Sequence, residues 1–352
     1  MSPLPRLLSI ATAVPPFELR QEEVLPAAVS HFGPQNASFQ RLMTVYANAA
    51  IDTRRSVMPL DWYGRDHSFA ERNALFLEHA VKLLEESALK ATEAAGLTLD
   101  EIDGLVVVSS SGIATPSLDA LLMEKMKLRR DMMRLPIFGL GCAGGTLGLG
   151  RAAAMARGTP GAKYLFLVVE LCGLTFRHND FSKSNIVATA LFADGAAGAV
   201  VGCEGDGPAI RGWGEHTWPS SLDIMGWDVR DDGLAVVFSR DIPNLVRTQM
   251  RPATDAFLAK QGLGHDDIGG YICHPGGIKV VEALEELYGL PAGGLKHSRE
   301  VLRRFGNMSA ATVMYVLADT LQDEQEKLYL MQSLGPGFTA GFLLLDTRRD
   351  AA

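Results

Sequence analysis

The sequence predicts an α/β protein made of two similar halves, and three observations lead to this prediction. Runs that are apolar on both faces alternate with segments of helical periodicity, as expected for a sheet covered by helices. The same order of segments occurs twice along the 352 residues. Matching positions keep a constant offset, because Ile268 follows Ile102 and Gly270 follows Gly104 by 166 residues (268 − 102 and 270 − 104). A shared order with a shared offset indicates an internal duplication.

The first half is expected to supply a long helix and four strands. Apolar residues recur at helical spacing over residues 71–96, which predicts an amphipathic helix. A polar lead-in, a buried strand and a loop are expected in LDEIDGLVVVSSSG. A second strand that continues into a helix is expected in RLPIFGLGCAGG and TLGLGRAAAMARG, and two further strands in AKYLFLVVEL and AAGAVVGC.

The second half repeats this plan in LGHDDIGGYICHPGG and in GNMSAATVMYVLADTLQDEQEKLYLMQSLGPG. Cys142 precedes Tyr164 by 22 positions (164 − 142), and Asn307 precedes Tyr329 by the same 22 (329 − 307). Cys142 and Asn307 are therefore expected at corresponding strand-to-helix turns. Because no Gly/Ser-rich linker divides the chain, we expect residues 1–205 and 206–352 to form two halves that pack as one body.

Composition and charge exclude several classes of function. A net charge of −8 disfavours nucleic acid or an anionic membrane as a general partner. No uninterrupted apolar run approaches the length of a membrane span, and the N-terminal apolar run is too short for a secretory signal. The four cysteines form no C-x-x-C pair, so neither a metal site nor a disulfide framework is expected. These features predict a cytoplasmic protein with reduced thiols.

The stretch GLGCAGG around Cys142 allows two interpretations. It contains G-x-G-x-x-G between a strand and a helix, a pattern that can hold the pyrophosphate of a dinucleotide, and Glu170 lies roughly where a ribose-binding acid belongs. The same stretch puts a cysteine at the start of a helix, where a thiol is activated as a nucleophile. We favour the nucleophile, because the motif lies in mid-chain and the thiol would occupy the phosphate-facing loop. Glu170 is then a structural or supporting group.

Two further residues complete a candidate nucleophilic site. His274 ends the strand GGYIC, and Pro275-Gly276-Gly277 after it forces an abrupt turn. Asn307 precedes a helix, where it can act as an N-cap, as an amide donor, or as both. In such a set the thiol attacks, the histidine deprotonates or pairs with it, and the amide donates to a developing oxyanion. We therefore expect Cys142, His274 and Asn307 to meet where the halves join.

Six motifs occur in order along the chain, namely GLGCAGG, VVELCGLTFR, LFADGAAGAVVG, HPGG, GNMSAAT and SLGPGFTAGFLLL. From about Leu7 to Asp346 the chain resembles the thiolase superfamily and, within it, the type III polyketide synthases of the chalcone synthase family. The resemblance implies a thiolase fold, with two α/β halves in a five-layer αβαβα arrangement, and a homodimer. It further implies an acyltransferase that uses coenzyme A thioesters as substrates and needs neither a metal nor another cofactor.

The resemblance also implies a role for each candidate catalytic residue. Cys142 takes an acyl group from CoA as a thioester, and the helix N-terminus and a positively charged His274 would both lower the pKa of its thiol. His274 and Asn307 bind the thioester oxygen of malonyl-CoA and stabilise the enolate that decarboxylation leaves. This carbanion attacks the Cys142 thioester and lengthens the acyl chain by two carbons.

Other positions match those that line the family's substrate cavity or bind CoA. Phe192 matches a gating phenylalanine, and Val236 stands where plant members place a second one. The remaining matches are Ser111, Cys172, Thr175, Ser309 and Gly335 for the cavity, and Arg41 and Lys279 for the phosphates of CoA. Thr44 and Asn48 replace two further cations of the CoA entrance, and Ser333-Leu334 replace the usual Gly-Phe.

The segment DIMGWDVRDDGLAVVFSRDIP resembles the bacterial branch that makes alkylpyrones and alkylresorcinols. Val236 would leave room beside Phe192, so we expect a medium- or long-chain fatty acyl starter, unless Phe238 fills the same space. Two alternatives stay open. One is an enzyme like ketoacyl-acyl-carrier-protein synthase III, which typically has His-Gln-Ala-Asn where this chain has His274-Pro275-Gly276-Gly277. The other is an acyl-CoA-binding homologue without activity.

Overall fold

The computed structural model describes residues 3–33, 39–323 and 325–348, and its main strands form one sheet assembled from two halves. The first half contributes β1 (Arg6–Ala13), β4 (Gly104–Val108), β5 (Met133–Ile137), β6 (Tyr164–Leu171) and β7 (Asp194–Gly202), and the second contributes β8 (Ala209–Thr217), β11 (Gly270–Cys273), β12 (Leu328–Gly335) and β13 (Thr339–Asp346). The strand order is β11-β12-β13-β8-β1-β7-β6-β4-β5. The halves meet between β1 and β8, where Arg6 pairs with Ala209.

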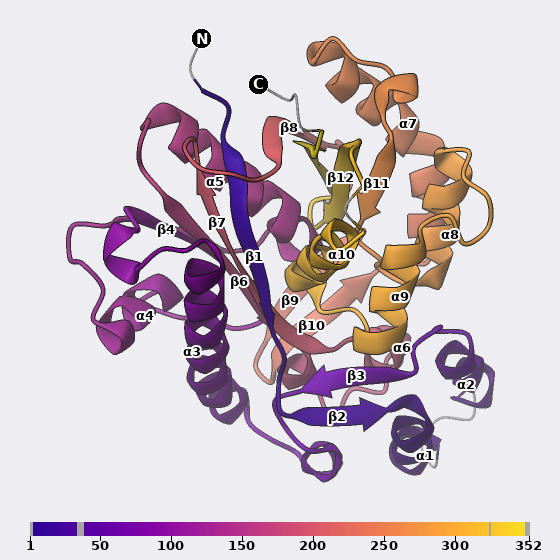
Figure 1. The fold of residues 1–352 in the computed structure, drawn as a ribbon. Helices are drawn as coiled ribbons and strands as arrows, with labels where there is room; N and C mark the ends of the chain where they lie inside the picture. The colour runs from indigo at the N-terminus through magenta and orange to yellow at the C-terminus, as the bar shows by residue number, and fades with distance from the viewer. Residues whose placement is uncertain (1–2, 34–38, 324, 349–352) are drawn as a thin grey trace.

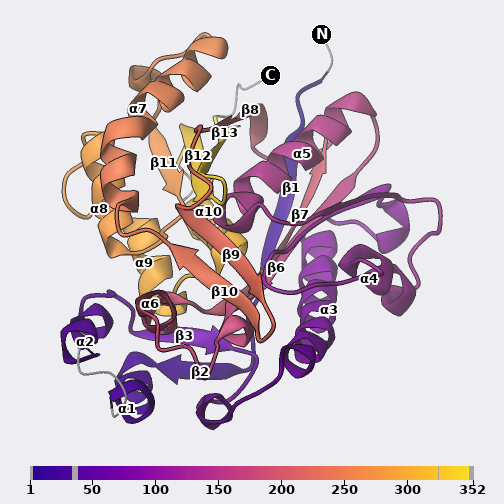
Figure 2. The ribbon, with the colours of Figure 1, turned by 180° about the vertical axis from the view of Figure 1, so that it is seen from behind.

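The helices arrange this sheet into five layers. They are α3 (Phe69–Ala94), α4 (Leu118–Met126), α5 (Gly144–Gly158), α7 (Ile242–Lys260), α8 (Ile278–Leu287) and α10 (Thr312–Leu321). In Figures 1 and 2, α3 and α4 cover the outer side of the first half, α5 and α10 lie between the halves, and α7 and α8 cover the outer side of the second half. The predicted αβαβα arrangement is therefore confirmed.

Fully buried apolar side chains fill the boundaries between these layers. Leu84 lies on the buried face of α3, Leu149 on that of the central helix α5, and Val246 on that of α7. Burial of each such side chain contributes about 2 kcal/mol. The helix expected over residues 71–96 begins and ends two residues earlier. Its start is set by Ser68, whose Oγ accepts the N–H of Glu71 and caps α3.

Strand pairing shows the internal duplication directly. β4 runs parallel to β6 with Gly104 opposite Tyr164, and β11 runs parallel to β12 with Gly270 opposite Tyr329. The match between Cys142 and Asn307 is not exact, however. Cys142 is the second residue of the turn η4 (Gly141–Ala143), whereas Asn307 lies two residues before the matching turn η7 (Ser309–Ala311). The chain enters the two central helices through turns of different construction.

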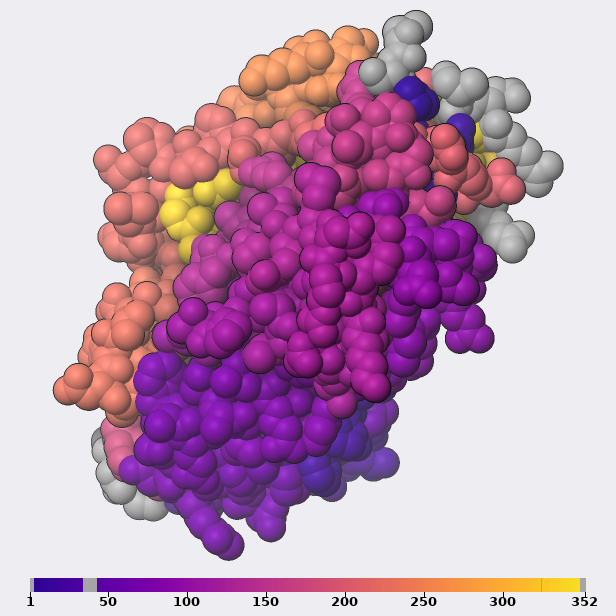
Figure 3. Space-filling view, turned by 90° about the vertical axis from the view of Figure 1, so that its left-hand side faces the viewer, coloured from indigo at the N-terminus to yellow at the C-terminus, as the bar shows by residue number. Residues whose placement is uncertain are grey.

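The strand β5 differs from its expected environment. The apolar run around LPIF predicts a buried strand, but β5 is the last strand of the sheet, and its residues are exposed or half-buried. Met133 is 49% exposed, Phe138 directly after the strand 62%, and Ile113 in a nearby loop 43%. Figure 3 looks onto the side of the molecule that carries α4, where residues of this purple-to-magenta part of the chain form much of the surface.

Smaller elements close one end of the molecule. They are β2 (Phe17–Arg20), β3 (Thr53–Ser56), α1 (Gln21–Phe32), α2 (Phe39–Ala47), η2 (Leu60–Gly64), η5 (Cys172–Thr175) and α6 (Lys183–Leu191). β2 pairs with β3 at the bottom of Figure 1. The helix α9 (Lys296–Phe305) packs against α10 and β3. β9 (Met225–Arg230) and β10 (Gly233–Phe238) form a separate two-stranded hairpin, which lies in front of the junction between the halves in Figure 2.

Among the described residues, no helix combines the length and the apolar character that a membrane crossing requires. The same part of the chain holds no cluster of His, Cys, Asp and Glu side chains suited to a metal ion. All four cysteines are free thiols.

Candidate active site

Cys142, the predicted nucleophile, lies at the start of the central helix α5. It belongs to η4, which runs directly into that helix. Its thiol donates a hydrogen bond to the hydroxyl of Ser309, with 3.5 Å between Sγ and Oγ. Ser309 opens η7 in a left-handed backbone conformation (φ 46°), which is uncommon for a residue other than glycine. The entries to the two central helices, one from each half, thus bring thiol and hydroxyl together.

His274 follows β11 at the carboxyl end of the strand. Its backbone N–H donates to the carbonyl of Gln332 on β12 (2.9 Å), which fixes the position of the residue. The side chain is only 5% exposed, yet neither Nδ1 nor Nε2 has a hydrogen-bond partner among the described residues. Buried polar groups are normally hydrogen-bonded, so both ring nitrogens are available to a ligand.

Asn307 holds the start of η7 and keeps an amide donor, but it is not the N-cap of that turn, since Met308 occupies the cap position. Its Oδ1 accepts the backbone N–H of Ser309 (2.9 Å), the first residue of η7, and its Nδ2 donates to the carbonyl of Gly276 (3.1 Å). An amide nitrogen carries two hydrogens, so one donor is left for a ligand. The side chain also ties the turn after His274 to the turn beside Cys142.

The three predicted catalytic residues line one small cavity of about 30 Å³, roughly the volume of one water molecule in the liquid. The other lining residues are Met225, Phe238, Ile242, Gly276, Val280, Leu284, Gln332, Ser333 and Leu334. The tertiary structure therefore brings Cys142, His274 and Asn307 together from both halves of the chain, as expected from the sequence.

Burial controls the charge of the thiol and the imidazole. Burial removes the Cys142 thiol from water and raises its pKa to about 12, although the hydrogen bond with Ser309 acts to lower the pKa. The same effect lowers the pKa of His274 to about 3. At neutral pH both groups are therefore uncharged. The expected lowering of the thiol pKa by the helix N-terminus and an imidazolium is wrong for this structure, because burial disfavours the charged form of each group.

The glycine-rich loop around Cys142 is covered by another loop of the protein. A Cβ on Gly141 (φ 47°) would lie 2.5 Å from the ring of Pro336, and a Cβ on Gly335 would lie 2.3 Å from the carbonyl oxygen of Leu140. No room is left for a pyrophosphate, so the structure argues against the dinucleotide interpretation. Gly335 permits this close approach of two backbones. It was predicted to line the substrate cavity but lines neither the small cavity at Cys142 nor the large cavity at Phe192.

Glu170 is a buried structural acid rather than a ribose-binding residue. It accepts hydrogen bonds from the N–H (3.1 Å) and hydroxyl (2.8 Å) of Ser110 and from the hydroxyl of Ser111 (2.6 Å). Burial raises its pKa against the effect of these bonds. The hydroxyl of Ser111 also accepts the N–H of Leu171 (2.9 Å). Ser111, predicted to line the substrate cavity, lines neither cavity and instead holds Glu170.

A second, large cavity of about 800 Å³ is lined by residues of α1, β3, η5, α6 and the β9–β10 hairpin. This volume is typical of small-molecule sites. Cys172, Thr175, Phe192 and Val236, all predicted to contact the substrate, line it. Much of the remaining wall is apolar or aromatic and includes Leu19, Val24, Phe32, Leu60 and Phe176.

Phe192 links the large cavity to the small one. Its side chain lines the large cavity, and its backbone forms a bridge with Asn307. Its ring packs edge-on against Trp227, with 6.2 Å between ring centroids. Trp227 lies opposite Val236 in the hairpin, and Phe238, two residues further along β10, lines the small cavity. Phe238 therefore does not take the place of Val236, since the two side chains face different cavities.

Trp227 and Gln332 are not among the residues that the sequence predicts for the site. The contact of Trp227 with Phe192 depends on the hairpin register, for which the sequence carries no signal. Gln332 lines the small cavity and accepts a hydrogen bond from the hydroxyl of Tyr288. A polar residue within the apolar strand LYLMQSLG was the available signal for Gln332.

The predicted CoA-binding cations are placed only in part. Lys279 is exposed in the first turn of α8, two residues after Gly277, and makes no ion pair within the described part of the chain. The side chain of Arg41 lies outside the described residues. Both assignments stay predictions.

A duplicated α/β chain with a cysteine, a histidine and an asparagine side chain at the junction of its halves belongs to the acyltransferases of the thiolase fold. The model of the N-terminal domain of chalcone and stilbene synthases matches residues 59–205, and that of their C-terminal domain matches residues 215–347. The chain therefore belongs to the chalcone and stilbene synthase family, the type III polyketide synthases, as the resemblance implied.

Individual relatives are similar over nearly the whole chain. The 1,3,6,8-tetrahydroxynaphthalene synthase of Streptomyces peucetius subsp. caesius is 38% identical, over 96% of this chain and 92% of its own. The alpha-pyrone synthesis polyketide synthase-like protein of Mycobacterium tuberculosis is 28% identical, over 88% and 83%. Among solved structures, the tetrahydroxynaphthalene synthase of Streptomyces coelicolor superimposes with a TM-score of 0.93 at 26% identity, covering 97% of this chain and 99% of that one.

Proposed function

We propose that this type III polyketide synthase condenses malonyl-CoA onto a medium- or long-chain fatty acyl-CoA and forms an alkylpyrone or alkylresorcinol, with Cys142, His274 and Asn307 as catalytic residues. The observation that carries the starter assignment is the largely apolar cavity of about 800 Å³ beside Phe192. Each methylene of an acyl tail buried there adds about 0.8 kcal/mol of binding free energy.

Acyl loading starts from the neutral pair. The Cys142 thiol gives its proton to the unpartnered imidazole of His274 as its sulfur attacks the thioester carbonyl of the acyl-CoA. The carbon–sulfur bond to CoA breaks, and CoA leaves as a thiol with the proton from His274. Because the pKa values of the separate groups oppose charge separation, proton transfer accompanies the attack.

Chain extension uses His274 and Asn307 as hydrogen-bond donors. A neutral imidazole N–H and the second N–H of the Asn307 amide bind the thioester oxygen of malonyl-CoA. Loss of carbon dioxide leaves the electron pair of the broken bond as an enolate, whose negative oxygen these donors stabilise. The enolate carbon attacks the Cys142 thioester and releases the Cys142 thiolate, and the lengthened chain is then carried by CoA.

The starter and the product are tested together. Purified protein is incubated with malonyl-CoA and a series of straight-chain acyl-CoAs beside an aromatic acyl-CoA, and products are identified by mass spectrometry while kcat/KM is measured. We expect kcat/KM to rise with chain length until the cavity is filled. A flat profile, or a preference for the aromatic starter, overturns the assignment. A naphthalene-type product from malonyl-CoA alone would favour the activity named for the Streptomyces peucetius relative.

The nucleophile is tested by intact-mass spectrometry after mixing with acyl-CoA. Cys142→Ala should carry no acyl adduct, whereas Cys172→Ala, which changes a thiol that lines the large cavity, should still carry one. An adduct that persists on Cys142→Ala refutes the assignment. Decarboxylation of malonyl-CoA by the unchanged protein separates an active synthase from an inactive acyl-CoA-binding homologue.

We further propose a homodimer joined through β5. The outer edge of this strand pairs with no strand among the described residues, and Met133 and Phe138 expose apolar surface beside it. Exposed edges and apolar patches of this kind favour association, and a second copy offers an equivalent edge.

We also propose a cytoplasmic location, because all four cysteines are free thiols.

A further inference from the structure

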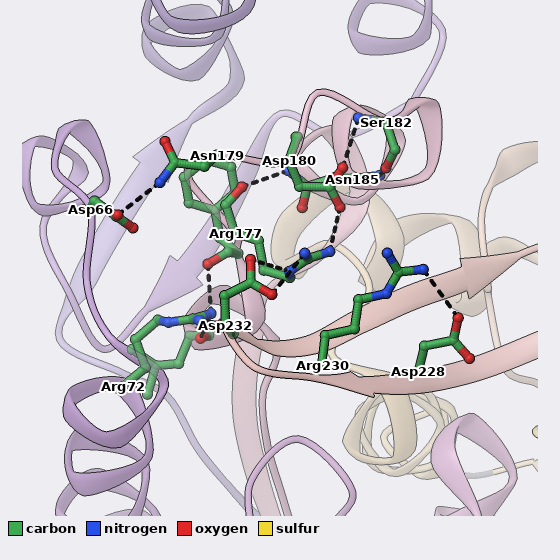
Figure 4. Close-up of polar contacts among 12 residues, drawn as sticks. Asp66, Arg72, Arg177, Asn179, Asp180, Ser182, Asn185, Asp228, Arg230 and Asp232 are labelled. Atoms are coloured by element: carbon green, nitrogen blue, oxygen red, sulfur yellow. Dashed lines mark hydrogen bonds and ion pairs between the residues drawn. The ribbon is translucent and has the colours of Figure 1, made fainter.

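The β9–β10 hairpin forms part of the wall of both cavities without belonging to the main sheet. An isolated two-stranded hairpin is only marginally stable, so its position depends on what holds it. Its tip, residues 231–233, is bound by two arginines from other elements. Figure 4 shows these contacts.

Arg177, in the segment between η5 and α6, binds the tip through a two-point ion pair. Its Nε lies 2.9 Å from Oδ2 of Asp232, and its Nη2 lies 2.8 Å from Oδ1. Its Nη1 donates to Asp180 (2.7 Å), and only 10% of the Arg177 side chain is exposed. Two parallel contacts between guanidinium and carboxylate restrict both distance and orientation.

Arg72, near the start of α3, binds the backbone of the same tip. Its guanidinium donates to the carbonyl of Asp232 and also to the carbonyls of Leu174 (3.2 Å) and Phe176 (2.8 Å). Gly233 (φ 129°) makes this approach possible, because a Cβ there would lie 2.7 Å from the Arg72 guanidinium. One largely buried side chain therefore joins the hairpin tip to residues 174–176.

The two segments joined in this way, η5 with the residue after it and the β9–β10 hairpin, both contribute to the wall of the large cavity, and β10 contacts η5. Cys172, Thr175 and Phe176 come from one segment, and Val236 comes from the hairpin, four residues beyond Asp232. Neither Arg72 nor Arg177 lines the cavity. Their contacts fix the spacing between side chains that do.

We propose that Arg72, Asp232 and Arg177 form a tip clamp that sets the width of the large cavity and thereby determines how strongly long acyl chains are preferred over short ones. The three are positioning residues, since they act through Val236 and residues 172–176. The inference rests on the proposed use of this cavity for the acyl starter. It requires that release of the hairpin tip loosens both walls together.

The test compares Asp232→Ala, Asp232→Glu and Asp228→Ala with the unchanged protein. Asp228 pairs with Arg230 (3.4 Å) within the same hairpin and reaches no other element in Figure 4, so it is a matched control. The readout is the ratio of kcat/KM for dodecanoyl-CoA to that for hexanoyl-CoA, in which contributions of the CoA moiety cancel. We expect the ratio to fall about tenfold in Asp232→Ala, which is the size of effect that a misfit of one methylene group has in an apolar pocket. Asp228→Ala should leave it unchanged, and Asp232→Glu should restore part of it.

Hydrogen exchange of the unliganded protein provides a second readout that needs no substrate. Asp232→Ala should lose amide protection both in residues 225–238 and in residues 172–177, whereas Asp228→Ala should not. The clamp proposal is overturned if Asp232→Ala leaves both the amide protection and the kcat/KM ratio unchanged. An equal fall of the ratio in Asp228→Ala also overturns it. If the unchanged protein shows no chain-length preference but Asp232→Ala loosens both segments, the starter proposal fails and the clamp stands as a structural tether without a role in selectivity.

Discussion

At the scale of single residues, the candidate site depends on side chains that are buried without being fully paired. The imidazole of His274 has no partner within the described residues, and the amide nitrogen of Asn307 retains one N–H after it donates the other to the carbonyl of Gly276. Such groups cost free energy in the resting protein. A substrate oxygen that binds to them would recover this cost, which is the physical basis of the oxyanion role proposed for the pair.

Replacement of Asn307 by aspartate should separate its two roles. Aspartate keeps the oxygen that accepts the N–H of Ser309 but loses the amide donor. We expect the decarboxylation rate of malonyl-CoA to fall about 10²–10³-fold, with acyl loading of Cys142 retained. The rate of carbon dioxide release measures decarboxylation, and intact-mass spectrometry measures acyl loading of Cys142. Native decarboxylation by Asn307→Asp would show that the residue only holds the start of η7.

Replacement of His274 by glutamine should change how stability depends on pH. Burial lowers the pKa of His274 from 6.5 to about 3, so the unfolded chain binds the additional proton between these values. The contribution of His274 to the free energy of unfolding is therefore fully present above pH 6.5, and it is lost as the pH falls from 6.5 toward 3. The unchanged protein should lose about 2 kcal/mol more than His274→Gln on going from near pH 7 to near pH 5.

Urea denaturation at several pH values measures this difference. Asp194, whose pKa burial raises to about 6, contributes in the opposite direction but is present in both proteins, so its effect cancels. Parallel stability curves for the two proteins would mean that His274 is not held neutral in the folded state.

At the scale of elements, the hairpin of β9 and β10 divides its side chains between two tasks. Residues two apart on a strand point to the same face, so Val236 and Phe238 face inward together but reach different cavities. Trp227, opposite Val236, contacts Phe192. The shape of the hairpin therefore affects the chemical centre and the large cavity together.

Replacement of Val236 by phenylalanine should shorten the longest acyl chain that the protein accepts, because the added ring occupies part of the large cavity. Val229 of the same hairpin is 72% exposed, so Val229→Phe is the matched control and should leave the profile unchanged. The kcat/KM series of straight-chain acyl-CoAs measures both variants. An unaltered profile in Val236→Phe would place the acyl tail elsewhere.

At the scale of the whole molecule, duplication creates the site. Each half contributes one central helix, and the turns that precede α5 and α10 meet through Cys142 and Ser309. The end of β11 supplies His274 beside them. Neither half holds all three residues, so the chemistry requires that both halves fold and pack together. The exposed edge at β5 is where we propose that a second copy of the chain packs.

Replacement of Phe138 by aspartate should weaken the proposed homodimer. A charge at this exposed apolar position next to β5 would be buried against its counterpart in a second copy. Light scattering after size-exclusion chromatography should show a dimer for the unchanged protein and a shift toward monomer for Phe138→Asp. Leu222→Asp, at an exposed leucine outside β5, is the control. A monomeric unchanged protein would refute the dimer proposal.

The sequence by itself determined the α/β class, the duplication and the family, because periodicity, offset and ordered motifs are properties of the chain. It also identified Cys142, His274 and Asn307 as residues that meet. The tertiary structure decided what depends on contacts between distant segments. It placed β5 at an exposed edge of the sheet, and it placed Ser111 where its hydroxyl donates a hydrogen bond to Glu170. It also put Val236 and Phe238 in the walls of separate cavities and packed Trp227 against Phe192. Burial likewise left Cys142 and His274 uncharged, against the expectation from helix position, because desolvation is a property of the folded molecule.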